Sequence, residues 1–227
     1  INLLMKSWIC LSMIGWIRMS NVLRIMDYLD HLIPNPKCEL NYSNLFELVC
    51  AVMISSQTTD KRVNMVTPEL FRKFPTPLAL SQATYEEVYE IIKSLGFANM
   101  KARNLISMAK TLHEVFHDVV PSTLEELQTL SGVGRKTASV VLAEGHKIPA
   151  MPVDTHLHRM AIRLGYVKAP ADVEACEGAF RKYIPKEEWI EAHHLLLLFG
   201  RYHCKAQNPQ CQDCTLKIFC TVKSKAI

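Results

Sequence analysis

Apolar residues recur every three or four positions along most of this chain, which predicts a succession of amphipathic helices. No segment alternates apolar and polar residues over the length of a strand, and no Asn-Gly turn or fixed-period repeat occurs. Counting the periodic segments gives about ten helices. The pattern therefore predicts an all-α fold.

Side chains that can cap a helix precede most of the apolar segments. The run from Leu45 to Ile54 is apolar nearly all round, which predicts a fully buried helix. Glycine is expected to close helices at Gly96, Gly165 and Gly200. The predicted caps are Asn44, Thr76, Thr84, Ser122, Asp154 or Thr155, and Asp172.

Residues 1–19 are apolar apart from two basic and a few small polar residues, and this length is near that of a membrane span. A membrane anchor is one interpretation, although no small-residue cleavage site flanks the segment. We favour an upstream extension, with Met19 as the start of the protein. Ser20 and Asn21 would then cap a helix that runs to about Ile33.

Composition places few limits on function. The chain has 227 residues, of which 49% are hydrophobic, so it forms one large or two small domains and is not disordered. A net charge of +4 permits nucleic-acid binding without demanding it. The candidate chemistry must therefore come from motifs.

The sequence LSGVGRKTASVVL spans residues 130–142 and predicts a helix, a tight turn and a second helix. Gly132 and Gly134 flank Val133, so the backbone can turn sharply there. The exposed N–H groups at the start of the second helix would bind an anion such as phosphate. Lys136 lies in the first turn of that helix, where the dipole disfavours a cation. Lys136 therefore either contacts a phosphate or takes part in a reaction.

Four of the eight cysteines cluster near the C-terminus, with the spacing C-x6-C-x2-C-x5-C. Four thiolates satisfy tetrahedral zinc or an iron–sulfur cluster. Only one pair is closely spaced, whereas structural zinc usually has two such pairs, so the spacing favours iron–sulfur. These residues are Cys204, Cys211, Cys214 and Cys220.

Two polar features have simpler interpretations. The segment SSQTTD, residues 55–60, reads as a capping turn for the next helix, with a cleft-lining loop as the alternative. Lys101, Arg103 and Lys110 follow one another along a predicted helix, where such charges usually form a solvated face.

Three features occur together: LSGVGRKTASVVL, then VDTHLHR with Asp154 eighteen residues after Lys136, then the four-cysteine cluster. This combination resembles the endonuclease III family of helix–hairpin–helix DNA glycosylases, from roughly Ser20 to the C-terminus. The family often has leucine and tyrosine where this chain has Phe97 and Ala98.

The resemblance implies two helical domains with a DNA-binding cleft between them. Residues 38–148 would form a six-helix barrel that carries the helix–hairpin–helix at 122–143. Residues 20–37 and 149–227 would form the second domain and hold a [4Fe–4S] cluster on the four cysteines. Residues 1–19 lie outside the resemblance.

By motif position, the resemblance assigns Lys136 as the nucleophile and Asp154 as the essential carboxylate. Taken alone, Asp154 also reads as a helix cap. Gln57 would fill the gap left by an extruded base, and Phe97 can wedge between bases as bulky apolar groups do. The remaining DNA contacts implied are Asp60, Gly132, Val133, Gly134 and Arg135. Burial, Arg135 and the helix start would favour the neutral amine of Lys136.

The activity implied is that of a bifunctional DNA glycosylase and AP lyase that removes oxidised pyrimidines through a lysine Schiff base and β-elimination. Its partner would be double-stranded DNA with damaged pyrimidines or abasic sites. A monomer is expected, in the cytoplasm at the nucleoid and not at a membrane. The alternatives are an adenine glycosylase, a non-catalytic helix–hairpin–helix protein and a zinc-stabilised DNA-binding protein.

Overall fold

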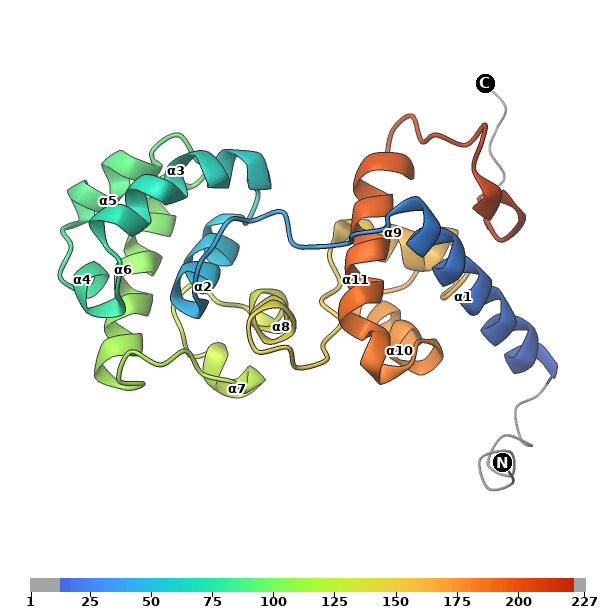
Figure 1. Cartoon of the computed structure of the whole chain (residues 1–227), viewed down its shortest axis with the longest axis horizontal. Coiled ribbons are helices and arrows are strands. Elements are labelled where there is room, and N and C mark those ends of the chain that lie inside the picture. The colour runs from blue at the N-terminus through green and yellow to red at the C-terminus, as the bar shows by residue number, and fades with distance from the viewer. Residues whose placement is uncertain (1–12, 223–227) are drawn as a thin grey trace. The chain divides into compact units, whose positions relative to one another are not determined.

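The structure is a computed structural model that describes residues 13–222, with side chains from residue 21 onward. Every regular element in that part of the chain is helical, with no strand (Figure 1), so the predicted all-α fold is confirmed. The chain divides into two compact units. One comprises residues 38–152, and the other joins the residues up to Lys37 to those from Val153 onward.

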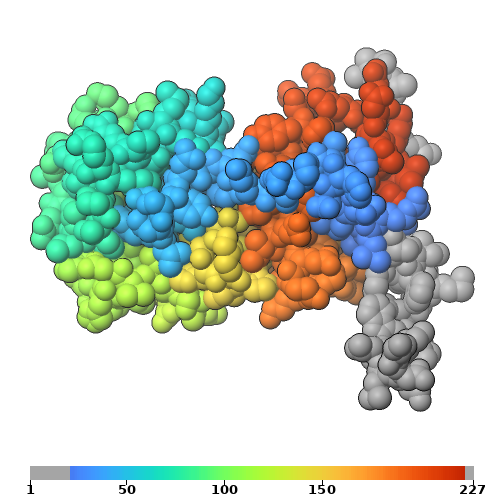
Figure 2. All heavy atoms as spheres, in the orientation of Figure 1, coloured from blue at the N-terminus to red at the C-terminus, as the bar shows by residue number. Residues whose placement is uncertain are grey.

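The core of the unit 38–152 surrounds α2 (Leu45–Ile54), which contacts α3, α6 and α8. Eight of its ten residues are buried, as its apolar sequence predicts. Side chains fill the spaces between the ribbons of this unit (Figure 2). Its other helices are α3 (Asp60–Lys73), α4 (Pro77–Ser81), α5 (Tyr85–Ile92), α6 (Ala98–Glu114), α7 (Leu124–Leu127) and α8 (Arg135–Glu144).

Side-chain caps explain why these helices begin where they do. The Asn44 side chain accepts a hydrogen bond from the N–H of Glu47 at the start of α2. Thr84 and Glu87 form a reciprocal capping box at α5. Both caps were predicted from the sequence and are confirmed.

Two predicted boundaries in this unit are wrong. Thr123, not Ser122, caps α7, because Thr123 and Glu126 form an overlapping cap signal one residue nearer the apolar segment. Gly96 does not close α5, which has already ended before it. The left-handed backbone conformation falls instead on Phe97, whose φ is 60°.

The second unit packs the N-terminal helix against the C-terminal ones. The predicted apolar face of α1 (Met13–Leu32) buries Val22, Ile25 and Leu29. The remaining elements are α9 (Thr155–Arg163), α10 (Val173–Tyr183), the short helix η1 (Lys186–Glu188), α11 (Trp189–Leu198), the π-helical turn η2 (Phe199–His203) and the short helix η3 (Thr215–Ile218).

The structure corrects two expectations in this unit. Helix α1 begins at Met13, so Ser20 and Asn21 lie inside it and do not cap it; the rest of the predicted extension, residues 1–12, falls outside the described residues. Gly200 does not end a helix, since α11 runs on into η2. A Cβ at Gly200 would lie 3.1 Å from the His156 Cβ, so this glycine permits close packing against α9. Within residues 13–222, no helix is long and apolar enough to cross a membrane.

Candidate nucleic-acid and cysteine sites

The hairpin between α7 and α8 is anchored by buried apolar residues and one glycine. Leu130 and Val133 are buried, and the Val133 N–H donates to the Leu130 C=O at 3.0 Å. Gly132 has a φ of 78°, and a Cβ there would lie 2.9 Å from Asn104 Nδ2 on α6. Gly132 is therefore required both by its backbone conformation and by its close contact with α6.

Gly134 has a different environment. Its φ is −84°, and a Cβ there would meet no atom within 4 Å. It occupies the N-cap of α8, where it has no side chain to cover the N–H groups of the first turn. An uncovered helix start beside the exposed cations Arg135 and Lys136 suits a phosphate group.

Lys136 is the second residue of α8, and its side chain is exposed. The expected burial of this side chain is therefore wrong. Exposure leaves the amine accessible to a substrate that approaches the hairpin.

The loop between α2 and α3 presents Gln57 to solvent in a left-handed conformation, with φ of 53°. The Thr58 N–H donates to the Ser55 C=O at 3.0 Å, and Thr59 caps α3 by accepting from the Arg62 N–H. The segment is thus a capping turn, as its composition predicts. Asp60, the first residue of α3, is half-buried.

Phe97 lies at the N-cap of α6, and 59% of it is exposed. A Cβ on the preceding Gly96 would lie 3.6 Å from the carbonyl oxygen of Gln57. Arg62 Nη2 donates to the Ser94 carbonyl at 2.7 Å. The structure thus brings Gln57 and Phe97, forty positions apart in the sequence, onto neighbouring loops.

Lys101 departs from the predicted solvated face of α6. It is 3% exposed, and its Nζ donates to the Thr58 hydroxyl at 2.8 Å. Burial lowers the pKa of this lysine. Sequence reasoning missed this contact, because its partner is 43 residues away and nothing in the local pattern separates Lys101 from Arg103 or Lys110.

Asp154, in the second unit, caps α9. Its Oδ1 accepts from the N–H groups of His156 and Leu157, both at 2.8 Å. These bonds orient the carboxylate and leave Oδ2 without a hydrogen bond inside the described chain. The capping role read from the sequence is confirmed, and it is compatible with a second role for the other oxygen.

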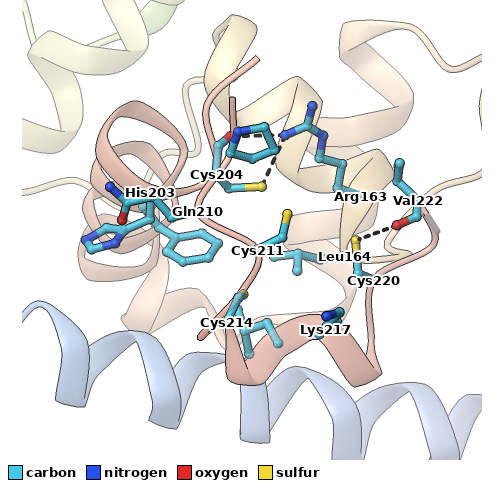
Figure 3. A pocket seen from close by; sticks show the side chains of 13 residues that line it. Arg163, Leu164, His203, Cys204, Gln210, Cys211, Cys214, Lys217, Cys220 and Val222 are labelled. Atoms are coloured by element: carbon cyan, nitrogen blue, oxygen red, sulfur yellow. Dashed lines mark hydrogen bonds between the residues drawn. The ribbon is translucent and has the colours of Figure 1, made fainter. Parts of the chain in front are cut away.

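All four clustered cysteines line one cavity of about 310 Å³ (Figure 3). Burial raises the pKa of the Cys214 thiol, and the other three sulfurs act in the same direction. Holding all four of these side chains as thiolates in one cavity would therefore require positive charge among them. Among the side chains described, those of residues 21–222, no three from His, Cys, Asp or Glu gather closely enough to hold a single metal ion.

Basic residues on α9 hold the first of these cysteines. Arg163 Nη1 donates to Cys204 Sγ at 3.3 Å, and Arg159 Nε donates to the Cys204 carbonyl at 3.0 Å. Arg159 Nη2 also donates to the Gly200 carbonyl at 2.6 Å. Four thiols with cations at the wall are a donor set that fits an anionic iron–sulfur cube.

Known proteins resemble this chain over most of its length. Residues 50–186 match the HhH-GPD superfamily, described as base excision DNA repair protein. Endonuclease III of Bacillus subtilis (strain 168) is 43% identical over 195 residues, which cover 86% of this chain and 89% of that relative.

Two solved structures are similar to the chain in both sequence and fold. They are a trapped endonuclease III–DNA covalent intermediate, with a TM-score of 0.86, and a non-covalent endonuclease III–DNA complex, with a TM-score of 0.87. Each is 41% identical, and each match covers 89% of this chain and 95% of the solved chain.

Proposed function

The chain belongs to the HhH-GPD superfamily of base excision DNA repair proteins, and we propose that it is a DNA glycosylase that also cleaves the strand at the abasic site. One observation carries the proposal. The exposed amine of Lys136 lies in the first turn of an uncapped helix, directly after a Gly-Val-Gly turn. The turn suits a DNA phosphate, and the amine suits attack on the adjoining sugar.

DNA would be bound through its backbone at the hairpin. Gly132 and Gly134 are proposed to offer main-chain N–H groups to a phosphate, while the Val133 N–H stays bound to the Leu130 carbonyl and shapes the turn. Arg135 adds a positive charge beside them. Because a base inside a duplex is inaccessible, the damaged pyrimidine must be extruded before reaction. Gln57 and Phe97 are proposed to enter the vacated space, and Asp60 to contribute a polar group near the base.

The reaction follows from a lysine nucleophile. Neutral Lys136 Nζ attacks C1′, and the base leaves with the electrons of the glycosidic bond and takes up a proton. Opening of the sugar ring then gives an iminium between Nζ and C1′. The iminium acidifies the C2′ proton, whose loss expels the 3′ phosphate by β-elimination. Hydrolysis of the iminium returns the free amine.

Asp154 is proposed as the carboxylate that assists this reaction. Its two backbone hydrogen bonds leave one oxygen able to accept the lysine proton or to stabilise positive charge on the sugar.

A [4Fe–4S] cluster is proposed on Cys204, Cys211, Cys214 and Cys220. In this site it would supply a rigid cross-link for the C-terminal segment. The purified protein is then expected to be brown, with broad absorption near about 400 nm. A colourless protein with one equivalent of zinc would contradict the assignment.

Since the proposed substrate is DNA, we place the protein in the cytoplasm at the nucleoid.

Borohydride trapping tests the main proposal. The protein is incubated with a duplex that contains thymine glycol, and the iminium is reduced to a stable amine. We expect a covalent protein–DNA adduct that is absent in Lys136→Ala and retained in Lys110→Ala, an exposed lysine of α6. If the intact protein gives no adduct with this duplex or with a preformed abasic site, the function is wrong. An adduct that persists in Lys136→Ala would mean that another amine is the nucleophile.

A further inference from the structure

Gln57 and Phe97 both have left-handed backbone conformations, although neither is glycine. Each such residue raises the free energy of the folded chain, and it persists only where surrounding contacts enforce it. Both side chains are exposed, so burial of their own apolar surface does not compensate for this strain. The enforcing contacts must therefore come from the neighbouring parts of the two loops.

Three contacts connect these loops. The backbone at Gly96 lies near the Gln57 carbonyl, which a Cβ there would meet at 3.6 Å, and Arg62 donates to the Ser94 carbonyl. The third contact is the hydrogen bond from Lys101 Nζ to the Thr58 hydroxyl. Of the three, only the Lys101 contact uses a buried charge.

Lys101 contacts both loops, one through its main chain and the other through its side chain. Its N–H donates to the Phe97 carbonyl at 3.0 Å in the first turn of α6, while its ammonium reaches the residue next to Gln57. No carboxylate in the described part of the chain pairs with this ammonium. A buried cation with one hydroxyl partner is costly compared with an apolar side chain of the same length. Packing alone therefore does not account for lysine at this position.

We propose that Lys101 is a positioning residue for base extrusion: its bond to Thr58 holds Gln57 beside Phe97, so that the two side chains enter the duplex as one preformed unit. The inference rests on the proposed glycosylase function and adds a residue that itself contacts neither the base nor the sugar. Preformed geometry spares the protein the cost of ordering two loops during extrusion.

The test compares Lys101→Met, which keeps the length of the side chain and removes the charge, with Lys110→Met on the exposed face of the same helix. Single-turnover release of thymine glycol is measured beside strand cleavage at a preformed abasic site, which requires no removal of a base. We expect Lys101→Met to slow base release by about tenfold, the scale of one lost charged hydrogen bond. Lys110→Met should keep the original rate, and cleavage of the abasic duplex should change little in either variant.

Two further variants separate positioning from general stability. Thr58→Val should reproduce the loss, and Thr58→Ser, which keeps the hydroxyl, should restore the rate. In a Phe97→Ala background, Lys101→Met should slow base release little further, because the Phe97 side chain that it positions beside Gln57 is already missing. These measurements also hold if Lys101→Met melts at a lower temperature, since Thr58→Ser and the Phe97→Ala background each supply an internal comparison.

Equal losses from Lys101→Met with and without Phe97→Ala would overturn the inference, as would normal base release in both Lys101→Met and Thr58→Val. Neither result would affect the proposed function, provided that the intact protein releases the base and forms the covalent adduct with DNA after borohydride reduction. Failure of the intact protein in those two assays would instead overturn the function itself.

Discussion

The hydroxyls of Ser107 and Ser131 lie 2.7 Å apart and form a hydrogen bond between α6 and the hairpin turn. The same helix carries Asn104, which packs against Gly132, and Lys101, which holds Thr58. One helix therefore supports both the proposed phosphate-binding turn and the proposed wedge loops. We expect its contacts to affect DNA binding as well as stability.

The serine pair gives the first prediction. Ser107→Ala and Ser131→Ala should each lower the free energy of unfolding by about 0.5 to 1 kcal/mol, since the bond is exposed to water. The double variant should cost little more than either single one. Urea denaturation of the four proteins measures this, and fully additive losses would show that the bond does not contribute.

The two hairpin glycines form a matched pair. Gly132→Ala should lower the free energy of unfolding by about 2 to 4 kcal/mol, because it combines a left-handed φ with a close contact to Asn104. Gly134→Ala should change stability by less than about 1 kcal/mol, since the new Cβ meets nothing and only the cap position is affected.

Gly134→Ala should weaken the binding of duplex DNA, although it changes stability little. Its added methyl group points into the space where a phosphate would approach, so affinity should fall while the protein stays folded. Fluorescence anisotropy with a labelled duplex measures the change. Unchanged affinity would argue against a phosphate at this turn.

Asp154 is expected to serve both as a helix cap and as a reacting carboxylate, and two substitutions separate these roles. Asp154→Asn keeps an oxygen that can accept from His156 and Leu157, so stability should hold while base release falls about 100-fold or more. Asp154→Ala should lose the activity and also about 1 kcal/mol of stability. Normal base release in Asp154→Asn would show that the residue is only a cap.

Glu87 gives a prediction about pH. The Thr84 N–H, followed by Lys73, lowers the pKa of this carboxyl from 4.5 to about 2. Because the folded pKa lies below the unfolded one, the stabilisation is complete above pH 4.5 and is lost as the pH falls toward 2. The difference in stability between the original protein and Glu87→Gln should shrink over that range in denaturant titrations. A difference in stability that is constant with pH would show that the ionised Glu87 carboxylate is not the source of the stabilisation.

Local signals in the sequence predict helix starts well. The caps at Asn44, Thr84 and Asp172 depend on residues within three positions of one another, so the sequence is sufficient to place them. Where two cap signals overlap, as at Ser122 and Thr123, the sequence does not decide between them.

Contacts between segments distant in the sequence explain the features that the sequence does not predict. Lys101 is buried where its amine reaches Thr58, and glycine is needed at position 200 because a Cβ there would lie 3.1 Å from the His156 Cβ. Phe97 adopts a conformation that its residue type disfavours, so no propensity scale would place it there. These positions are set by packing partners 40 or more residues away, which helical periodicity does not reveal.

Helix α9 begins at the cap formed by Asp154 and ends at Arg163, whose guanidinium donates to Cys204 Sγ. Its nine residues make a rod about 13 Å long. The cysteine segment therefore braces the far end of the helix that orients the carboxylate. Loss of the Cys204 side chain would remove the sulfur that Arg163 contacts, so we expect the end of α9 to loosen and the orientation of Asp154 at its other end to become less fixed.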